Sequence, residues 1–115
     1  MIDFACKRFN LNDIVKCALG LTRAECKVFR YFFENSAENI TTECLAEKLE
    51  LNLSTIQKAT KKLNEHGIIL RYQKNLEGGG YIYTYEANSK KQIRRILKKI
   101  INNWAENVGR AIDDW

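Results

Sequence analysis

The side chains best suited to chemistry lie between Thr41 and Gly67, and the chemistry that they favour is hydrogen bonding to a polyanion. The stretch predicts two helices joined by a tight turn, and its second helix buries Ile56, Ala59 and Leu63 at helical spacing. The outward face is expected to carry hydroxyl, amide and ammonium groups and no carboxylate: Thr55, Gln57, Lys58, Lys61, Lys62 and Asn64. Such a face suits a helix inserted into the major groove of DNA. A solvated amphipathic helix is the alternative explanation of these residues alone.

Capping residues predict where the two helices begin. Thr41 or Thr42 is expected to cap the first helix, because a threonine hydroxyl can accept a hydrogen bond from a first-turn amide. The turn is expected to cover Glu50–Leu53, with Leu51 and Leu53 filling the space between the helices. Ser54 is expected to cap the second helix.

Length and composition predict one globular domain. The chain has 115 residues, of which 45% are hydrophobic and 29% are charged, enough for a single core. It contains no proline, which suits a mainly helical fold. No apolar run approaches the roughly 20 residues that a membrane span needs. The first ten residues, MIDFACKRFN, lack the apolar core of a signal peptide, so we expect a cytoplasmic protein without a membrane partner.

The net charge of +5 is concentrated in two blocks. Residues 54–74 carry five cations against Glu65, and residues 90–99 carry six cations and no acid. Concentrated positive charge in two separate segments indicates a polyanion as partner.

The four cysteines do not have the spacing of a metal site. Cys6, Cys17, Cys26 and Cys44 include no C-x-x-C pair, and His66 is the single histidine. We therefore expect small buried hydrophobic side chains, no metal and no cofactor. The alternative is a redox-active thiol, chiefly at Cys6 or Cys17, because both have basic neighbours that favour a thiolate.

The pattern changes from helical to alternating after Gly67, which is expected to end the second helix in the left-handed conformation. Residues 68–73 and 81–86 predict two strands, and a glycine-rich tip lies between them. No helix follows the glycines, so they do not form a phosphate-binding loop of the nucleotide-binding type. A hairpin that directly follows the second helix predicts a wing.

Two helices are expected before this region. A short helix is predicted over residues 12–19, capped by Asn12 or Asp13. Thr22 and Glu25 form a capping box, which opens a buried helix over residues 23–35.

The last element is a long amphipathic helix from Lys90 to Ile112, capped by Asn88 or Ser89. At 1.5 Å per residue it spans roughly 35 Å, longer than a core of this size can cover. We expect its apolar face to pair with a second copy of the chain, supported by the N-terminal segment around Phe4 and Phe9. The alternative is a helix folded back on its own domain. The expected dimer interface consists of Ile93, Leu97, Ile100, Trp104, Val108 and Ala111.

Three segments together resemble a known group of regulators. LTRAECKVFRYF resembles the L-T-x-x-E-x-x-V opening helix of MarR-type and TrmB-type winged-helix regulators, and LSTIQKATKKLNEHGII is similar to their recognition helix and its exit. GGGYIYTYEA, followed by a basic helix, resembles the wing of small archaeal TrmB-like proteins. The resemblance covers residues 20–115. The wing departs from the MarR pattern, since Glu77 and glycines stand where MarR proteins usually carry an Asp-x-Arg pair, and any small-molecule effector stays unknown.

The resemblance implies a mainly α fold with a small β-hairpin (α+β), a winged helix-turn-helix with a long C-terminal dimerisation helix. Residues 1–20 would support the dimer, residues 21–88 would form the DNA-binding domain and residues 89–115 the dimerisation helix. The implied function is a homodimeric transcriptional regulator that binds an inverted repeat in double-stranded DNA. A winged-helix protein-interaction module of the transcription machinery is the alternative. An enzyme is disfavoured, because one histidine and no paired acidic site leave little for catalysis.

The expected DNA contacts divide into two groups. If the recognition helix enters the major groove with its N-terminus first, the side chains nearest the bases are Ser54, Thr55, Gln57 and Lys58. The side chains expected at phosphates are Lys61, Lys62, Arg71 and Lys74.

Overall fold

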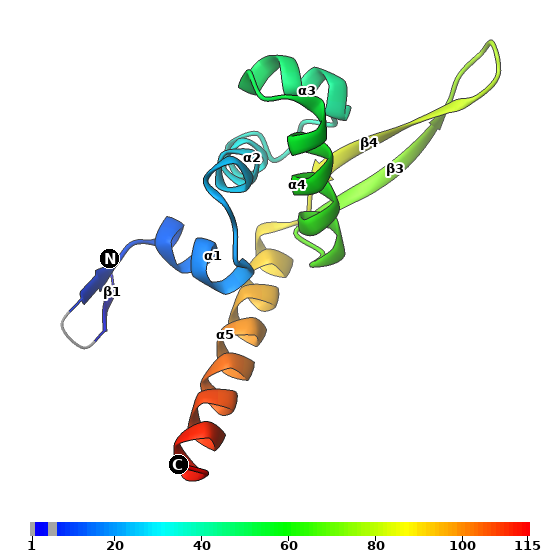
Figure 1. Cartoon of the computed structure of the whole chain (residues 1–115). Helices are drawn as coiled ribbons and strands as arrows, with labels where there is room; N and C mark the ends of the chain where they lie inside the picture. Colours follow the sequence, from blue (N-terminus) through cyan, green and yellow to red (C-terminus); the bar gives the residue numbers. More distant parts are fainter. Residues whose placement is uncertain (1, 5–6) are drawn as a thin grey trace.

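The computed structural model describes the backbone of residues 2–4 and 7–115, and the side chains of residue 10 and of residues 12–115 (Figure 1). In chain order its elements are β1 (Ile2–Phe4), β2 (Lys7–Phe9), α1 (Leu11–Leu19), α2 (Arg23–Glu34), α3 (Thr42–Leu49), α4 (Leu53–Glu65), β3 (Ile69–Asn75), β4 (Tyr81–Ala87) and α5 (Lys90–Asp113). The expected role of Phe4 and Phe9 and the state of Cys6 lie outside the described side chains.

Helices α3 and α4 form the predicted helix-turn-helix, and β3 and β4 pair antiparallel as the hairpin that follows it. The hairpin projects beyond α4, and α5 leads away towards the opposite end of the molecule (Figure 1). Ile40 forms an isolated bridge to Tyr85, with N–H···O distances of 2.9 and 2.8 Å. This bridge ties the base of the hairpin to the segment that enters α3, so wing and helix-turn-helix are one winged helix-turn-helix unit.

One hydrophobic core runs through the helices and the base of the hairpin. Its buried residues come from α1 to α5, and include Val15, Val28, Phe32, Leu45, Ile56, Leu63, Ile69 and Ile93. Replacing a fully buried leucine or isoleucine in such a core with alanine costs about 2–5 kcal/mol. The core therefore fixes the position of α4 relative to the hairpin.

Most of the predicted caps are confirmed. Thr22 and Glu25 exchange both hydrogen bonds of a capping box, the Thr41 hydroxyl accepts from the Cys44 amide, and Ser89 caps α5. The first helix differs from expectation: Asn10 is its cap and accepts from the Asp13 amide at 2.9 Å, so α1 begins earlier than Asn12.

The turn before α4 also differs from expectation. Asn52, not Ser54, is the N-cap, and Leu53 is already the first helical residue. Glu50 makes the turn in the left-handed conformation, with φ of 54°. Leu53 is 38% exposed and does not fill the space between the helices, because starting the helix at Leu53 turns its side chain to the surface.

Helix α5 divides into two halves. Ile93 is buried in the core of its own chain, and Ile96, Leu97 and Ile100 are partly buried against that core. The first half of α5 therefore packs on its own domain, which agrees with the alternative prediction for this helix. In the second half, Trp104 is 59% exposed. Any surface offered to a second chain therefore begins after Ile93.

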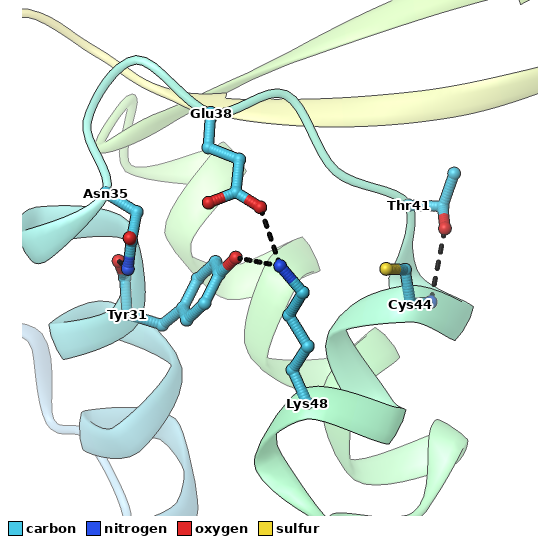
Figure 2. Close-up of polar contacts among 6 residues, drawn as sticks. All are labelled: Tyr31, Asn35, Glu38, Thr41, Cys44 and Lys48. Atoms are coloured by element: carbon cyan, nitrogen blue, oxygen red, sulfur yellow. Dashed lines mark hydrogen bonds and ion pairs between the residues drawn. The ribbon is translucent and has the colours of Figure 1, made fainter.

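A polar cluster holds α3 against α2. The Lys48 ammonium donates to Glu38 Oε1 at 2.9 Å and to the Tyr31 hydroxyl at 3.3 Å (Figure 2). The hydrogen bond from Lys48 lowers the pKa of Glu38, and hydrogen bonds to Glu38 and Tyr31 raise the pKa of Lys48. The cluster lies at the surface, where such pairs add little stability. Its effect is to orient α3, and no chemistry is assigned to it.

The cysteines are less buried than expected. Cys17 and Cys44 are exposed and Cys26 is half-buried, so the buried assignment is wrong for the first two. Side-chain burial depends on which helix face meets the core, and cysteine is tolerated on both the core-facing and the solvent-facing side. Among the described residues, no three His, Cys, Asp or Glu side chains lie close enough to hold a metal ion. No helix in the described part combines the length and apolarity that crossing a membrane requires.

Candidate nucleic-acid interface

The outward face of α4 is narrower than the sequence predicts. At 100° per residue, Ile56, Ala59, Thr60 and Leu63 point inward, and all four are buried. The opposite face presents Ser54, Gln57, Lys58 and Lys61, all exposed, with Thr55 half-buried at its flank. The first acidic residue on this face is Glu65, which is the last residue of the helix. On this face, the first three turns of α4 therefore present amide, hydroxyl and ammonium groups and no acid.

Lys62 does not belong to this face, in contrast to the prediction. Its ammonium donates to the carbonyl oxygen of Gly20 at 2.7 Å and to Glu25 Oε1 at 3.2 Å. Lys62 thus anchors α4 to the start of α2, because it lies at the edge of the buried stripe where α2 packs. Asn64 is likewise turned inward, and its amide donates to the Ile69 carbonyl at 3.1 Å.

Asn52 organises the N-terminus of α4 through a single oxygen. Its Oδ1 accepts from the Thr55 amide at 3.1 Å and from the hydroxyls of Ser54 and Thr55, each at 2.9 Å. A hydroxyl has one donor and two acceptor lone pairs. Since both donors are directed to Asn52, Ser54 and Thr55 present acceptors to the outside. The Ser54 and Thr55 side chains are therefore oriented before any ligand arrives.

A groove of about 330 Å³ separates α4 from the wing. Gln57 and Thr60 form the α4 wall, Thr42 and Glu43 close the end at α3, and Tyr81, Ile82, Tyr83 and Tyr85 form the β4 wall. Tyr81 and Tyr83 meet edge to face, with ring centroids 5.3 Å apart. The groove thus joins an exposed residue of α4, Gln57, to an aromatic strand.

The two cations of the wing lie on different faces of the hairpin. The register pairs Arg71 with Tyr85 and Lys74 with Ile82. Because neighbouring strand positions alternate between faces, Arg71 shares the tyrosine face and Lys74 the other. The Arg71 guanidinium lies 4.4 Å from the centroid of the Tyr83 ring, an attractive cation–π geometry that directs it along this face.

Tyr81 at the groove is a neutral hydrogen-bond donor. The interaction with the Tyr83 hydroxyl raises the pKa of the Tyr81 phenol above its ordinary value of 10.0. Tyr81 therefore keeps its proton at neutral pH and can donate to an anionic oxygen.

The sequence pattern alone does not mark Asn52, Tyr81 or Tyr83 as site residues. The alternation of Tyr81, Tyr83 and Tyr85 was a usable signal, since it places all three on one strand face. No local pattern shows that this face turns towards α4.

The family model for the DnaD N-terminal domain matches residues 9–108. The chain belongs to the DnaD N-terminal domain family. The finer assignment to a TrmB-like or MarR-like group stays a prediction.

Relatives of this DnaD N-terminal domain chain include a solved structure that matches it throughout. It is a "possible transcriptional regulator" from Methanosarcina mazei, 46% identical, covering 100% of this chain and 96% of its own, with a TM-score of 0.87. An uncharacterised protein from Methanocaldococcus jannaschii is 28% identical over 99% of this chain and 85% of its own length. The transcriptional regulator BldR from Sulfolobus solfataricus is 19% identical over 90% of this chain and 70% of its own, with a TM-score of 0.51. The BldR similarity shows the fold alone.

Proposed function

We propose that this protein is a sequence-specific double-stranded DNA-binding transcriptional regulator that acts as a homodimer, with no catalytic step. The observation that carries the proposal is the outward face of α4, whose first three turns hold hydroxyl, amide and ammonium groups and no acid. Protein-binding surfaces are poor in lysine at their centre. The name of the Methanosarcina mazei relative, a possible transcriptional regulator, supports the same function.

The proposed docking places the N-terminus of α4 in the major groove. Gln57 can form two hydrogen bonds to adenine and Lys58 can reach guanine, each worth about 1–3 kcal/mol of discrimination. Ser54 and Thr55, held by Asn52, offer acceptors to the amino groups of adenine or cytosine.

The backbone contacts come from both sides of the groove beside α4. Lys61 and Arg71 are exposed cations on the two sides, and Arg71 is directed by the Tyr83 ring. The Tyr81 hydroxyl can donate to a phosphate oxygen on the same face. Lys74, on the other face of the hairpin, would reach a phosphate only near the wing tip. Lys62 does not contact phosphate in this docking, because Glu25 already neutralises its charge.

The proposed dimer is formed by the second half of α5. Trp104, Val108 and Ile112 are exposed there at helical spacing, together with Ala111, and a continuous apolar strip on a projecting helix is typical of an interface. Leu97 and Ile100, partly buried, would border it. A two-fold axis along this helix relates two copies of α4, so the proposed DNA site is an inverted repeat.

The test uses the complete chain and a library of genomic fragments, with binding measured across a salt series. The proposal expects enrichment of an inverted repeat whose half-sites are about one helical turn apart, with affinity that falls as salt rises. Recovery of unrelated sequences with equal affinity would contradict sequence-specific regulation. Absence of any duplex binding would favour a winged-helix module that contacts proteins of the transcription machinery.

A further inference from the structure

The first ten residues of α5 carry an unusual density of unpaired positive charge. Lys90, Lys91, Arg94, Arg95, Lys98 and Lys99 are all exposed, and the next acid in the chain is Glu106. Among the described side chains, the ion pairs join Lys48 to Glu38, Lys62 to Glu25 and Arg110 to Glu106. None of the six cations is therefore neutralised within the described part of the molecule.

Five of these cations form one surface, which we call the basic face of α5: Lys91, Arg94, Arg95, Lys98 and Lys99. Together with Asn102 and Asn103 they line a shallow hollow of about 570 Å³. At 100° per residue this face lies opposite Ile93 and Leu97, which pack on the core. Neither the core nor a dimer through the apolar side of α5 would cover it.

The basic face works against the stability of its own helix. A helix N-terminus carries partial positive charge and favours acids, yet the first turn of α5 holds none. Like charges three or four residues apart also repel one another. A helix face that serves only solubility usually alternates lysine with glutamate. An arrangement that costs folding stability is explained by a ligand that neutralises it.

We propose that the basic face of α5 is a second phosphate-binding surface for double-stranded nucleic acid. Helix α5 leads away from the hairpin (Figure 1), so phosphates bound by this face would lie outside the segment that α4 and the wing contact. The inference deepens the proposed function and rests on it for the location of the duplex. Its ligands are phosphate oxygens, which arginine and lysine bind without regard to sequence.

A membrane surface fits the same helix less well. A helix that lies in an anionic membrane surface combines basic and exposed apolar side chains on the same segment. In α5 they are separated: the basic segment has its apolar side packed against the core. Residues 101–115, which expose Trp104 and Ile112, carry Glu106, Asp113 and Asp114 against one arginine. The charge pattern therefore favours nucleic acid.

The experiment compares two triple variants of the full chain. Arg94→Gln, Arg95→Gln and Lys98→Gln remove three charges from the basic face, and Lys16→Gln, Arg23→Gln and Arg30→Gln remove three exposed charges from α1 and α2. Binding to a duplex of about 40 base pairs is measured across a salt series. We expect the α5 variant to flatten the logarithmic salt slope by roughly two to three units per protomer, and the control variant to leave it near wild type. Circular dichroism should show the α5 variant folded, with Tm equal to or above that of wild type.

A third variant, Gln57→Ala with Lys61→Ala, separates this inference from the proposed function. A flattened slope in the α5 variant, with normal binding by the α4 variant, would support the basic face and contradict the docking of α4. Weakened binding by the α4 variant, with an α5 variant that matches its control, would overturn the inference alone. Vesicles containing phosphatidylserine serve as a second probe. An α5 variant that loses vesicle binding and keeps full duplex binding would also overturn it.

Discussion

Lys61 and Lys62 are adjacent lysines with different surroundings. Lys61 is exposed on the outward face of α4, whereas Lys62 is held by Glu25 and the Gly20 carbonyl. The charge of Lys62 therefore contributes to the fold, and that of Lys61 is available to a ligand.

Replacing these lysines one at a time should separate stability from binding. Lys62→Gln loses a partly buried ion pair and a hydrogen bond to a backbone carbonyl, and should lower the free energy of unfolding by about 1–2 kcal/mol. Lys61→Gln should change it by less than about 0.5 kcal/mol. Urea unfolding followed by circular dichroism measures both. Equal effects on stability would contradict the assignment of Lys62 to the α2–α4 contact.

The same contact predicts a dependence on pH. Burial acts to raise the pKa of Glu25, but the Thr22 amide and the Lys62 ammonium outweigh it, so the pKa is lowered from its ordinary value of 4.5. A lowered pKa in the folded state gives stability that is complete above the unfolded-state pKa and is lost as the pH falls through the folded-state value. The stability difference between wild type and Glu25→Gln should therefore shrink between pH 6 and pH 3. A difference that stays constant over this range would show that the carboxylate charge is not involved.

At the scale of elements, α4 is organised by its cap. The sequence offers Asn52 and Ser54, two residue types that cap helices equally well, and local pattern does not choose between them. The structure selects Asn52, because the left-handed Glu50 ends α3 and leaves a turn short enough for Leu53 to begin α4.

Alanine substitutions should identify the cap. Asn52→Ala removes the acceptor for the Thr55 amide and should cost about 1 kcal/mol of stability, within a range of about 0.5–2 kcal/mol. Ser54→Ala removes a hydroxyl that only donates to Asn52 and should cost less than about 0.5 kcal/mol. Thermal unfolding of the two variants decides between them, and a larger loss in Ser54→Ala would restore Ser54 as the cap.

The elements also show what the sequence can predict. Short-range signals succeeded: the Thr22–Glu25 box, the Thr41 and Ser89 caps, and Gly67, which has φ of 79° as the left-handed stop requires. Contacts between distant segments were missed. Lys62 and Glu25 are 37 positions apart, and a single sequence carries no signal that joins them. The burial of Ile93 and the groove beside Tyr83 depend in the same way on how the elements pack.

At the scale of the whole molecule, the elongated shape follows from the wing and α5. The chain extends over 61 × 25 × 24 Å, and the hairpin and α5 lie towards opposite ends (Figure 1). Helix α5 has 24 residues, about 36 Å at 1.5 Å per residue, and its first half alone packs on the core. The second half is available to bring two copies together.

The proposed dimer can be tested with one charge on each side of α5. Trp104→Asp would bury a carboxylate in the apolar contact, at a cost of several kcal/mol, and should give a folded monomer. Asn102→Asp places the same charge on the polar side, which the contact leaves open, and should stay dimeric. Analytical ultracentrifugation with circular dichroism distinguishes the two states. A folded Trp104→Asp dimer would exclude this interface.

The central claim is that α4 reads bases with Gln57 and holds the backbone with Lys61. The most direct measurement is the binding of Gln57→Ala and Lys61→Ala to matched and mismatched duplexes of the recovered site across a salt series. Gln57→Ala should lose about 1–3 kcal/mol of discrimination at one position in each half-site and keep its salt slope. Lys61→Ala should weaken all duplexes alike and flatten the slope by roughly one unit per protomer. If the two variants behave identically, or if neither changes binding, α4 does not enter the major groove in this way.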